Sequence, residues 1–347
     1  MKICFIGEAE SIFVLRMADW LREHGHKVQM ISISRTSPES SEHYDECVDV
    51  IRRLGFRGYI SRVLPIRKHV REMKPDVVHG HYMTSGGFYA RWSGHRHIVT
   101  SLWGSDIYQD AKTLGQRMLV RSAIRGSDVV TGDSDHILNE VKKYGPNVRT
   151  EKFLFGVNAS LFVPKPELKP KVFTFLSGRS SYPLYNPIRI VKAFELLDGT
   201  DARLLIQKPK NFYPELENVV VQSPVRNRIE WYPVRAHSEM PNLFGRAHVT
   251  ISIPDSDSSS GVMMESMACG VPVIASRIPA NDEWDCIGIY VPKDDSPEAL
   301  ADVMKKLMDQ PEFVREGGKF AREVIIQRAD WDKQMEALVE LYEELVG

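Results

Sequence analysis

Short apolar runs alternate with helix-period segments along the first half of the chain. Residues 2–6 predict a strand that leads through a polar loop into a helix ending at Gly25, and further strands are expected at residues 27–33, 76–79, 98–102 and 128–131. Strands that alternate with helices in this way are typical of βαβ units around a parallel sheet. The pattern therefore predicts a doubly wound α/β domain.

The same alternation begins again near residue 171. A strand at residues 171–176 leads into Gly178 and a helix over residues 188–197, and later strands are expected at residues 204–206, 219–221, 249–253, 271–275 and 287–291. The segment 157–170 contains three prolines and is the candidate linker. We therefore expect an α/β protein with two doubly wound domains, residues 1–160 and 165–329. Apolar residues at helical spacing from Trp331 to Leu345 predict a final amphipathic helix.

The composition narrows the class of protein. A chain of 347 residues is longer than one hydrophobic core usually organises, which agrees with two domains. The net charge of -1 argues against general nucleic-acid binding, and no apolar run is long enough to span a bilayer. The start of the chain becomes amphipathic instead of forming a signal peptide, so a cytoplasmic protein is expected. The four cysteines are scattered, which favours neither a zinc site nor a disulfide framework.

The segment from residue 251 to residue 274 carries the strongest chemical signal. A predicted strand ends in a small, polar loop, a helix begins near Gly261, and Gly270 closes that helix before the next strand. Backbone N–H groups and the positive end of the helix dipole would then lie beyond the carboxyl edge of a sheet, where a diphosphate can bind. Glu265, one turn into the helix, is placed to accept hydrogen bonds from a ribose. A capping-box role for this glutamate would need Ser or Thr at the position of Val262.

This segment resembles the hallmark of glycosyltransferase family 4, the group 1 retaining transferases with the GT-B fold. The match comprises Asp257, seven intervening residues, Glu265, and the run from Ser266 to Val273. Similarity extends over nearly the whole chain, with further matching segments at residues 75–81, 104–107, 133–134, 152–162 and 296–300. The resemblance implies two Rossmann-like domains that face a cleft, with the final helix, residues 330–347, packed back on the first domain.

The resemblance also implies a donor site in the second domain for a nucleoside-diphosphate sugar. Glu265 would hold the ribose hydroxyls, Asp257 would contact the transferred hexose, and Arg179 would bind the leaving diphosphate, which makes these three the expected catalytic residues. A second basic residue that is usual in the family is replaced here by Asn186. The expected donor-binding residues are Gly7, Gly178, Asn186, Val234, Arg235, Ser260, Gly261, Val262 and Met263.

The resemblance places an acceptor site in the first domain. Trp103 stands where family members often have His. The pairs His79/His81 and His95/His97 have the spacing of metal ligands on one face of a strand, but no consistent set of further ligands follows, so neither a metal nor a cofactor is expected. The expected acceptor or cleft residues are Glu8, His81, Gly104, Ser105 and Asp106.

Basic residues are concentrated in one stretch. Residues 51–74 carry many arginines and lysines against the single acid Glu72, and apolar residues lie between them. A basic amphipathic surface over residues 52–74 would suit peripheral contact with anionic lipid. A solvated helix face, or a groove for a phosphorylated acceptor, explains the same pattern.

The implied function is a step of glycan biosynthesis. A hexosyl-type sugar would move from a nucleoside-diphosphate sugar to a hydroxyl of a glycan, lipid-linked or small-molecule acceptor, with retention of anomeric configuration and without a metal. The sequence leaves the base, sugar and linkage open. A nucleotide-sugar 2-epimerase and a non-catalytic nucleotide-sugar-binding partner of another transferase are the alternatives. A nicotinamide dehydrogenase is disfavoured because no GxGxxG follows the first strand.

Overall fold

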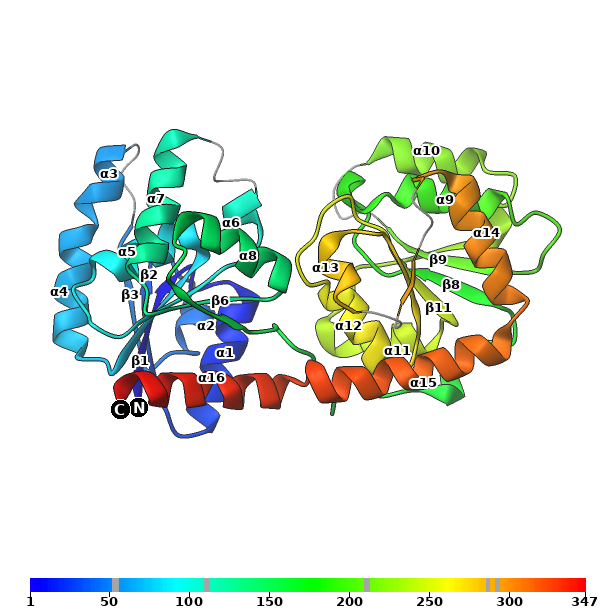
Figure 1. Ribbon diagram of the computed structural model, residues 1–347. Coiled ribbons are helices and arrows are strands. Elements are labelled where there is room, and N and C mark those ends of the chain that lie inside the picture. Colours follow the sequence, from blue (N-terminus) through cyan, green and yellow to red (C-terminus); the bar gives the residue numbers. More distant parts are fainter. Residues whose placement is uncertain (52–55, 109–112, 209–212, 285–287, 291–293) are drawn as a thin grey trace. The chain divides into compact units, whose positions relative to one another are not determined.

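The computed structural model describes residues 1–347 except 52–55, 109–112, 209–212, 285–287 and 291–293. Part of the basic stretch and both ends of the strand expected at 287–291 therefore lie outside the described residues. The chain forms two compact units, of which the first comprises residues 1–155 and 332–347 and the second residues 156–331. Each unit is built on a parallel sheet with helices packed against it (Figure 1), which confirms the expected fold class.

Within the described residues, the sheet of the first unit has seven strands in the order β3-β2-β1-β4-β5-β6-β7. The chain passes from β1 to β2 on one side and later crosses to β4 on the other side. The carboxyl ends of β1 and β4 therefore form a switch point, the place where ligands bind in open parallel sheets. The strands are β1 (Lys2–Gly7), β2 (Lys27–Ser32), β3 (Glu46–Asp49), β4 (Val77–His81), β5 (Ile98–Ser101), β6 (Val129–Gly132) and β7 (Arg149–Lys152).

The final helix, α16 (Trp331–Val346), packs on the first unit, where Figure 1 shows it in red near α1. Tyr342 Oη lies 2.5 Å from His79 Nδ1 on β4, and Trp20 Nε1 donates to Asp332 at 2.8 Å. Both ends of the chain thus contribute to one core. The other helices of this unit are α1 (Ile12–Glu23), α2 (Pro38–Ser41), α3 (Phe56–Ser61), α4 (Val63–Met73), the π-helical turn η1 (Tyr82–Gly87), α5 (Phe88–Trp92), α6 (Ser105–Tyr108), α7 (Leu114–Arg125) and α8 (Asp135–Tyr144).

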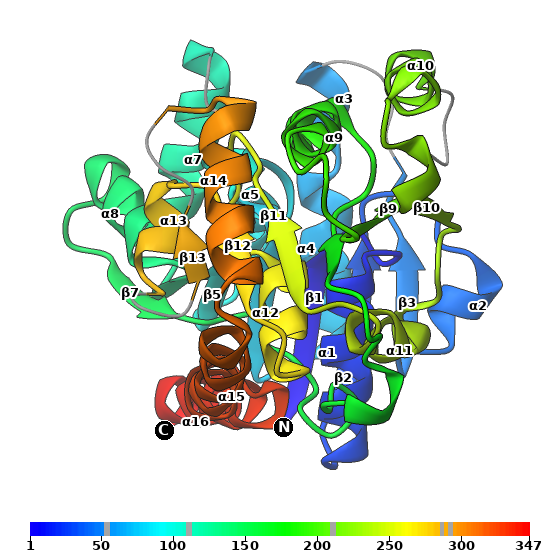
Figure 2. The same ribbon diagram turned by 90° about the vertical axis from the view of Figure 1, so that its right-hand side faces the viewer.

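In the described part of the second unit, six parallel strands follow the order β10-β9-β8-β11-β12-β13. The helix α12 lies against β11 and β12, and α15 packs on α12 (Figure 2). The strands are β8 (Thr174–Ser177), β9 (Arg203–Gln207), β10 (Ile229–Tyr232), β11 (Val249–Ser252), β12 (Val273–Ala275) and β13 (Gly288–Tyr290). The helices are α9 (Pro187–Glu195), α10 (Pro214–Gln222), α11 (Met240–Gly245), α12 (Gly261–Ala268), α13 (Pro279–Asp282), α14 (Pro297–Met308) and α15 (Pro311–Arg328), with short 3-10 turns between some of them.

The strand expected at residues 219–221 is wrong, because these residues belong to α10. A proline at the first helical position and two glutamates in the first turn favour a helix start here. Leu216 and Val220, four residues apart, are buried, whereas Val221 is 67% exposed. A run of three valines suggests a strand, but the burial follows the helical period. The sheet takes β10 as its edge strand.

Two further edge strands, β3 and β7 in the first unit, are not predicted by the sequence pattern. They read Glu-Cys-Val-Asp and Arg-Thr-Glu-Lys, and no residue of either is fully buried. Edge strands are exposed on one side and often carry charged residues that discourage pairing with other chains. Because these two sequences are polar, a prediction based on apolar runs does not detect the strands.

Candidate functional site

The loop between β11 and α12 leads into a helix N-terminus that can bind an anion. Ser260 is the N-cap of α12, and its Oγ accepts the backbone N–H of Met263 at 3.3 Å. The N–H groups of Gly261 and Val262 precede the first intrahelical hydrogen bond, so helix geometry gives them no helical acceptor. A Cβ added at Gly261 would meet no atom within 4 Å. The space beside this helix end is open, and its partial positive charge favours a phosphate.

Arg179 lies at the same helix end and is held there by three contacts. Its Nη1 donates to Ser260 Oγ at 2.9 Å, and its Nη2 lies 3.0 Å from Asp257 Oδ2. The guanidinium also lies over the ring of Tyr185, 4.2 Å from the centroid. The side chains of Arg179 and Asp257 are only 13% and 16% exposed. Two of the three expected catalytic residues therefore form a partly buried ion pair beside the helix N-terminus.

Glu265, the third expected catalytic residue, is bonded to a histidine that the sequence did not single out. Glu265 Oε1 lies 2.7 Å from His237 Nε2, and the glutamate side chain is 14% exposed. His237 begins a short 3-10 turn after β10, and its ring packs against Phe162 with 5.0 Å between the ring centroids. The sequence indicates only a surface histidine at this position. The contact fixes the direction of the Glu265 carboxylate.

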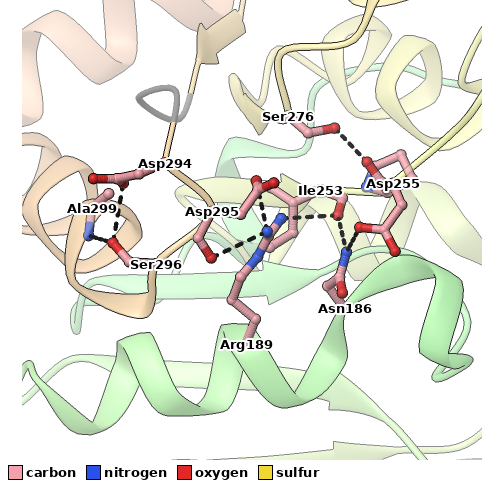
Figure 3. Close-up of polar contacts among 10 residues, drawn as sticks. Asn186, Arg189, Ile253, Asp255, Ser276, Asp294, Asp295, Ser296 and Ala299 are labelled. Atoms are coloured by element: carbon pink, nitrogen blue, oxygen red, sulfur yellow. Dashed lines mark hydrogen bonds and ion pairs between the residues drawn. The ribbon is translucent and has the colours of Figure 1, made fainter.

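The first part of the β11–α12 loop is anchored by the start of α9 (Figure 3). Asn186 Nδ2 donates to the backbone carbonyl of Ile253 at 3.0 Å and to Asp255 Oδ1 at 2.6 Å. Arg189 donates to the same carbonyl at 3.3 Å, and its Nη1 lies 2.7 Å from Asp295 Oδ1. Asn186 has a φ of 54°, a conformation that asparagine adopts more readily than most residues. Asn186, which replaces the second basic residue usual in the family, thus uses its amide to hold the loop.

Other expected donor residues of the second unit also follow strands at their carboxyl ends. Gly178 comes directly after β8, and a Cβ there would lie 2.7 Å from a side-chain carbon of Thr250 and 2.8 Å from one of Val262. Glycine therefore lets the loop after β8 pass close to the start of α12. Val234 and Arg235 follow β10, and the Val234 side chain is 52% exposed. Contact of these residues with a nucleotide stays a prediction.

The first unit contains a cavity of about 1020 Å³ at the carboxyl edge of its sheet. Glu8, Ile33, His81 and Trp103, which follow or end β1, β2, β4 and β5, line this cavity at the switch point. Glu8 is exposed, whereas His81 is 2% exposed. At Gly7 a Cβ would come 3.1 Å from the Cβ of His81, so glycine allows these strand ends to approach closely. A role of Gly7 in donor binding stays a prediction.

The expected acceptor residues 104–106 form the turn that follows Trp103. Asp106 is fully buried, and its carboxylate accepts the backbone N–H of Met83 at 2.8 Å and that of Trp103 at 3.2 Å. Gly104 has a φ of 90°, which only glycine adopts without strain. Asp106 therefore positions the backbone of two cavity-forming segments, and Ser105 lies in the same turn. Direct contact of these residues with an acceptor stays a prediction.

The paired histidines of β4 differ in their surroundings. His79 Nε2 lies 2.7 Å from Ser101 Oγ, and its Nδ1 contacts Tyr342, so His79 belongs to the core. Burial lowers the pKa of His81 to about 3 and that of His79 well below its usual range. Both rings are therefore neutral near pH 7. Among the described residues no group of three or more His, Cys, Asp or Glu side chains is placed to hold a metal ion.

No helix in the ranges that the structure describes is both long and apolar enough to cross a bilayer.

Comparisons with known proteins agree with the geometry of both units. Residues 2–134 match the sequence model of the glycosyl transferase 4-like proteins, and residues 161–324 match that of the glycosyl transferases group 1. A D-inositol 3-phosphate glycosyltransferase of Saccharomonospora viridis is 24% identical over 321 residues, which cover 78% of this chain and 70% of the relative.

Solved structures show the same fold. A glycosyltransferase of Rickettsia africae superposes with a TM-score of 0.83 at 17% identity, and the match covers 99% of this chain and 98% of the other. HepE of Anabaena, in a complex with UDP, gives a TM-score of 0.83 at 14% identity over 99% of this chain and all of the other. The chain therefore belongs to the group 1 glycosyltransferases with a glycosyl transferase 4-like first half and the GT-B fold.

Proposed function

We propose that this glycosyltransferase moves a hexosyl-type sugar from a nucleoside-diphosphate sugar to an acceptor hydroxyl, with retention of anomeric configuration and without a metal ion. The observation that carries the proposal is the Arg179–Asp257 pair at the N-terminus of α12. The donor diphosphate would lie at this helix end, and Glu265, one turn further, would accept hydrogen bonds from the ribose. The UDP complex of the similar HepE structure supports UDP as the first nucleotide to test.

In this mechanism the bond between the anomeric carbon and the diphosphate oxygen breaks, and the anomeric carbon bonds to the acceptor oxygen. Negative charge grows on the departing phosphate, where Arg179 and the N–H groups of Gly261 and Val262 would stabilise it. The acceptor proton would pass to the leaving phosphate. A fixed guanidinium and a helix end supply positive charge that a metal ion provides in other transferases, which supports metal independence. Retention rests on the family resemblance.

The acceptor is proposed to bind in the cavity of the first unit, which lies at the switch point of that sheet. The relative from Saccharomonospora viridis is named for a phosphorylated polyol, D-inositol 3-phosphate. A small or lipid-linked polyol and a glycan are therefore the acceptor classes to compare. No cofactor is included in the proposal, because the donor already carries the activated sugar.

Peripheral membrane contact through residues 52–74 is also proposed. Ile60 and Leu64 are 47% and 74% exposed, and the neighbouring Lys68 and Arg71 are exposed as well. Exposed apolar residues beside cations suit an anionic lipid surface. Sedimentation with phosphatidylcholine vesicles, with and without phosphatidylglycerol, tests this: binding should require the anionic lipid and fall in Leu64→Glu. Equal binding of wild type and variant would reject the contact.

The donor site is tested by thermal unfolding with UDP, GDP, ADP and their sugars in the presence of EDTA. A ligand at a hundredfold excess over its Kd stabilises the native state by about 2.7 kcal/mol. One nucleotide should raise the unfolding temperature, and Glu265→Gln should reduce that shift. Glu323→Gln, an exposed glutamate on α15, is the matched control and should behave as wild type.

The reaction products distinguish the proposed transferase from a 2-epimerase and from a non-catalytic nucleotide-sugar-binding protein. A glycosylated acceptor with the donor's anomeric configuration supports the proposal, whereas an inverted product would reject retention. Conversion of the nucleotide sugar to its 2-epimer without an acceptor would favour the epimerase. Nucleotide binding without any product would favour the non-catalytic partner. No shift with any nucleotide would reject the donor site itself.

A further inference from the structure

The cavity of the first unit is lined by buried side-chain nitrogens that have no hydrogen-bond partner among the described residues. Within the described residues, neither ring nitrogen of His81 has a hydrogen-bond partner, and the same holds for Trp103 Nε1 and Arg62 Nε. His81 and Arg62 are 2% and 5% exposed. A buried donor without an acceptor costs about 1–3 kcal/mol, so folding would not keep several of them in one cavity without another use. A ligand rich in oxygen acceptors would satisfy them together.

Arg62 adds a buried charge to this set. Its Nη2 donates to the carbonyl of Ile33 at 3.0 Å, its Nη1 donates to Tyr89 Oη at 3.4 Å, and its guanidinium lies 5.7 Å from the centre of the Tyr89 ring. None of the carboxylates in the described ranges forms an ion pair with it. A buried cation is costly unless an anion pairs with it. The neutral contacts fix the guanidinium, and no carboxylate of the described residues compensates its charge.

The other lining residues add little negative charge. Glu8 is the one acidic residue among the described lining residues, and its side chain is exposed at the strand end. His81 is neutral near pH 7, since burial lowers its pKa to about 3, so it can donate one hydrogen bond and accept another. Such a ring suits a hydroxyl group. Arg62 suits an anionic oxygen, and the indole N–H of Trp103 suits either.

We propose that this cavity selects an acceptor that carries both hydroxyls and an anionic group, a phosphate or a carboxylate, and that Arg62 binds the anion. His81 and Trp103 would donate to hydroxyl oxygens of the same molecule. This inference rests on the proposed function, because only the transfer reaction makes the bound molecule an acceptor. The binding chemistry of the cavity can be measured without a donor. Arg62 is then a specificity-determining residue, which belongs to the basic stretch identified in the sequence.

The test is binding of matched probes, followed by calorimetry and by the fluorescence of the tryptophans. The pairs are glycerol 3-phosphate against glycerol and myo-inositol monophosphate against myo-inositol, with inorganic phosphate as the minimal anion. At least one phosphorylated probe should bind at least tenfold more tightly than its neutral partner. Arg62→Gln should remove that preference, whereas Arg62→Lys should keep part of it. Arg125→Gln, an exposed arginine in the last turn of α7 and outside residues 52–74, is the control and should keep all of it.

A second experiment with lipid vesicles identifies the source of the anionic group. Phosphatidylcholine vesicles that contain phosphatidylinositol should bind in an Arg62-dependent manner if the acceptor is a lipid headgroup. Soluble probes alone should show the dependence if the acceptor is free. Either result supports the inference, whereas equal binding of charged and neutral probes, or equal loss in Arg62→Gln and Arg125→Gln, would overturn it.

Two further measurements distinguish a failure of this inference from a failure of the proposed donor site. Arg62→Gln should retain the nucleotide-induced rise in unfolding temperature, which also shows that the variant folds. Anion selectivity without any nucleotide binding would reject the donor site and leave the cavity chemistry standing. Nucleotide binding without anion selectivity would reject the inference and leave the proposed function standing.

Discussion

Arg179 and Asp257 approach to 3.0 Å between Nη2 and Oδ2 at the N-terminus of α12, and both side chains are mostly buried. The carboxylate holds the guanidinium in place, but it also adds a negative charge where the donor phosphates are expected. Asp257 therefore has opposite effects on the orientation of Arg179 and on the binding of an anion. These two effects can be measured separately.

We expect Asp257→Asn to lower turnover while nucleotide binding is kept or strengthened. Loss of a charge-assisted contact to Arg179, about 1.5–3 kcal/mol, corresponds to roughly a 10- to 150-fold fall in kcat. Removal of a negative charge should leave the Kd for UDP unchanged or lower. Steady-state kinetics and calorimetry measure the two quantities, with Asp309→Asn on an exposed site as the control. A parallel loss of turnover and UDP affinity would contradict this division of roles.

Asn186→Asp should destabilise the second unit. The substitution replaces an N–H donor by a carboxylate that faces the carbonyl of Ile253 and the carboxylate of Asp255. Loss of these bonds and the new repulsion should reduce the free energy of unfolding by about 1–3 kcal/mol. Urea denaturation at neutral pH measures the change. Asn218→Asp on an exposed face of α10 is the control. Equal effects of the two substitutions would show that the hydrogen bonds of Asn186 do not stabilise the second unit.

His237 should matter for nucleotide affinity through Glu265. His237→Ala removes the bond that directs the carboxylate, so the Kd for the nucleotide should rise by up to about tenfold, the factor that corresponds to a net hydrogen bond of roughly 1.5 kcal/mol. His237→Gln can still donate to Glu265 and should show a smaller change. Calorimetric titration with UDP compares the variants. If the two substitutions weaken binding equally, the hydrogen bond is not the cause.

Acid should destabilise the protein because His79 and His81 are buried as neutral rings. Their pKa values are lowered in the folded state, so below about pH 6.5 the unfolded chain binds protons that the native protein does not. The free energy of unfolding should therefore fall with a slope that approaches about 1.4 kcal/mol per pH unit for each histidine about one unit below that value. Urea denaturation between pH 7.5 and 5.5 measures the slope. His81→Gln should reduce the slope by one histidine's share, and an unchanged slope would contradict the assignment.

The alternation of strands and helices could be read from the sequence wherever strands are buried. Lys2–Gly7 lies in the middle of its sheet, and its apolar run marks it clearly. Glu46–Asp49 and Arg149–Lys152 are held by backbone pairing at the two edges, which side-chain polarity does not reveal. The β-branched residues 219–221 favour a strand locally, but the packing of Leu216 and Val220 makes them part of the helix Pro214–Gln222.

The candidate site was predictable in its residues and less so in its contacts. Arg179, Asp257 and Glu265 could be named from the motif, and the structure places Arg179 and Asp257 together at one helix end. The partner of Glu265 could not be named, because His237 comes from a segment 28 residues away with no motif of its own. The backbone N–H groups that donate to Asp106 are likewise set by the fold, because the sequence does not show whether a carboxylate in a turn binds a ligand or the backbone.

The contact between His79 and Tyr342 joins residues that are 263 positions apart. On the ribosome, the sheet of the first unit emerges early, but the helix that covers His79 emerges after the entire second unit has been made. The second unit can therefore complete its fold first. Until the final helix is made, part of the core of the first unit stays exposed. A chaperone that binds nascent chains would have time to bind this exposed surface of the first sheet. Slower synthesis of the second unit would lengthen the exposure.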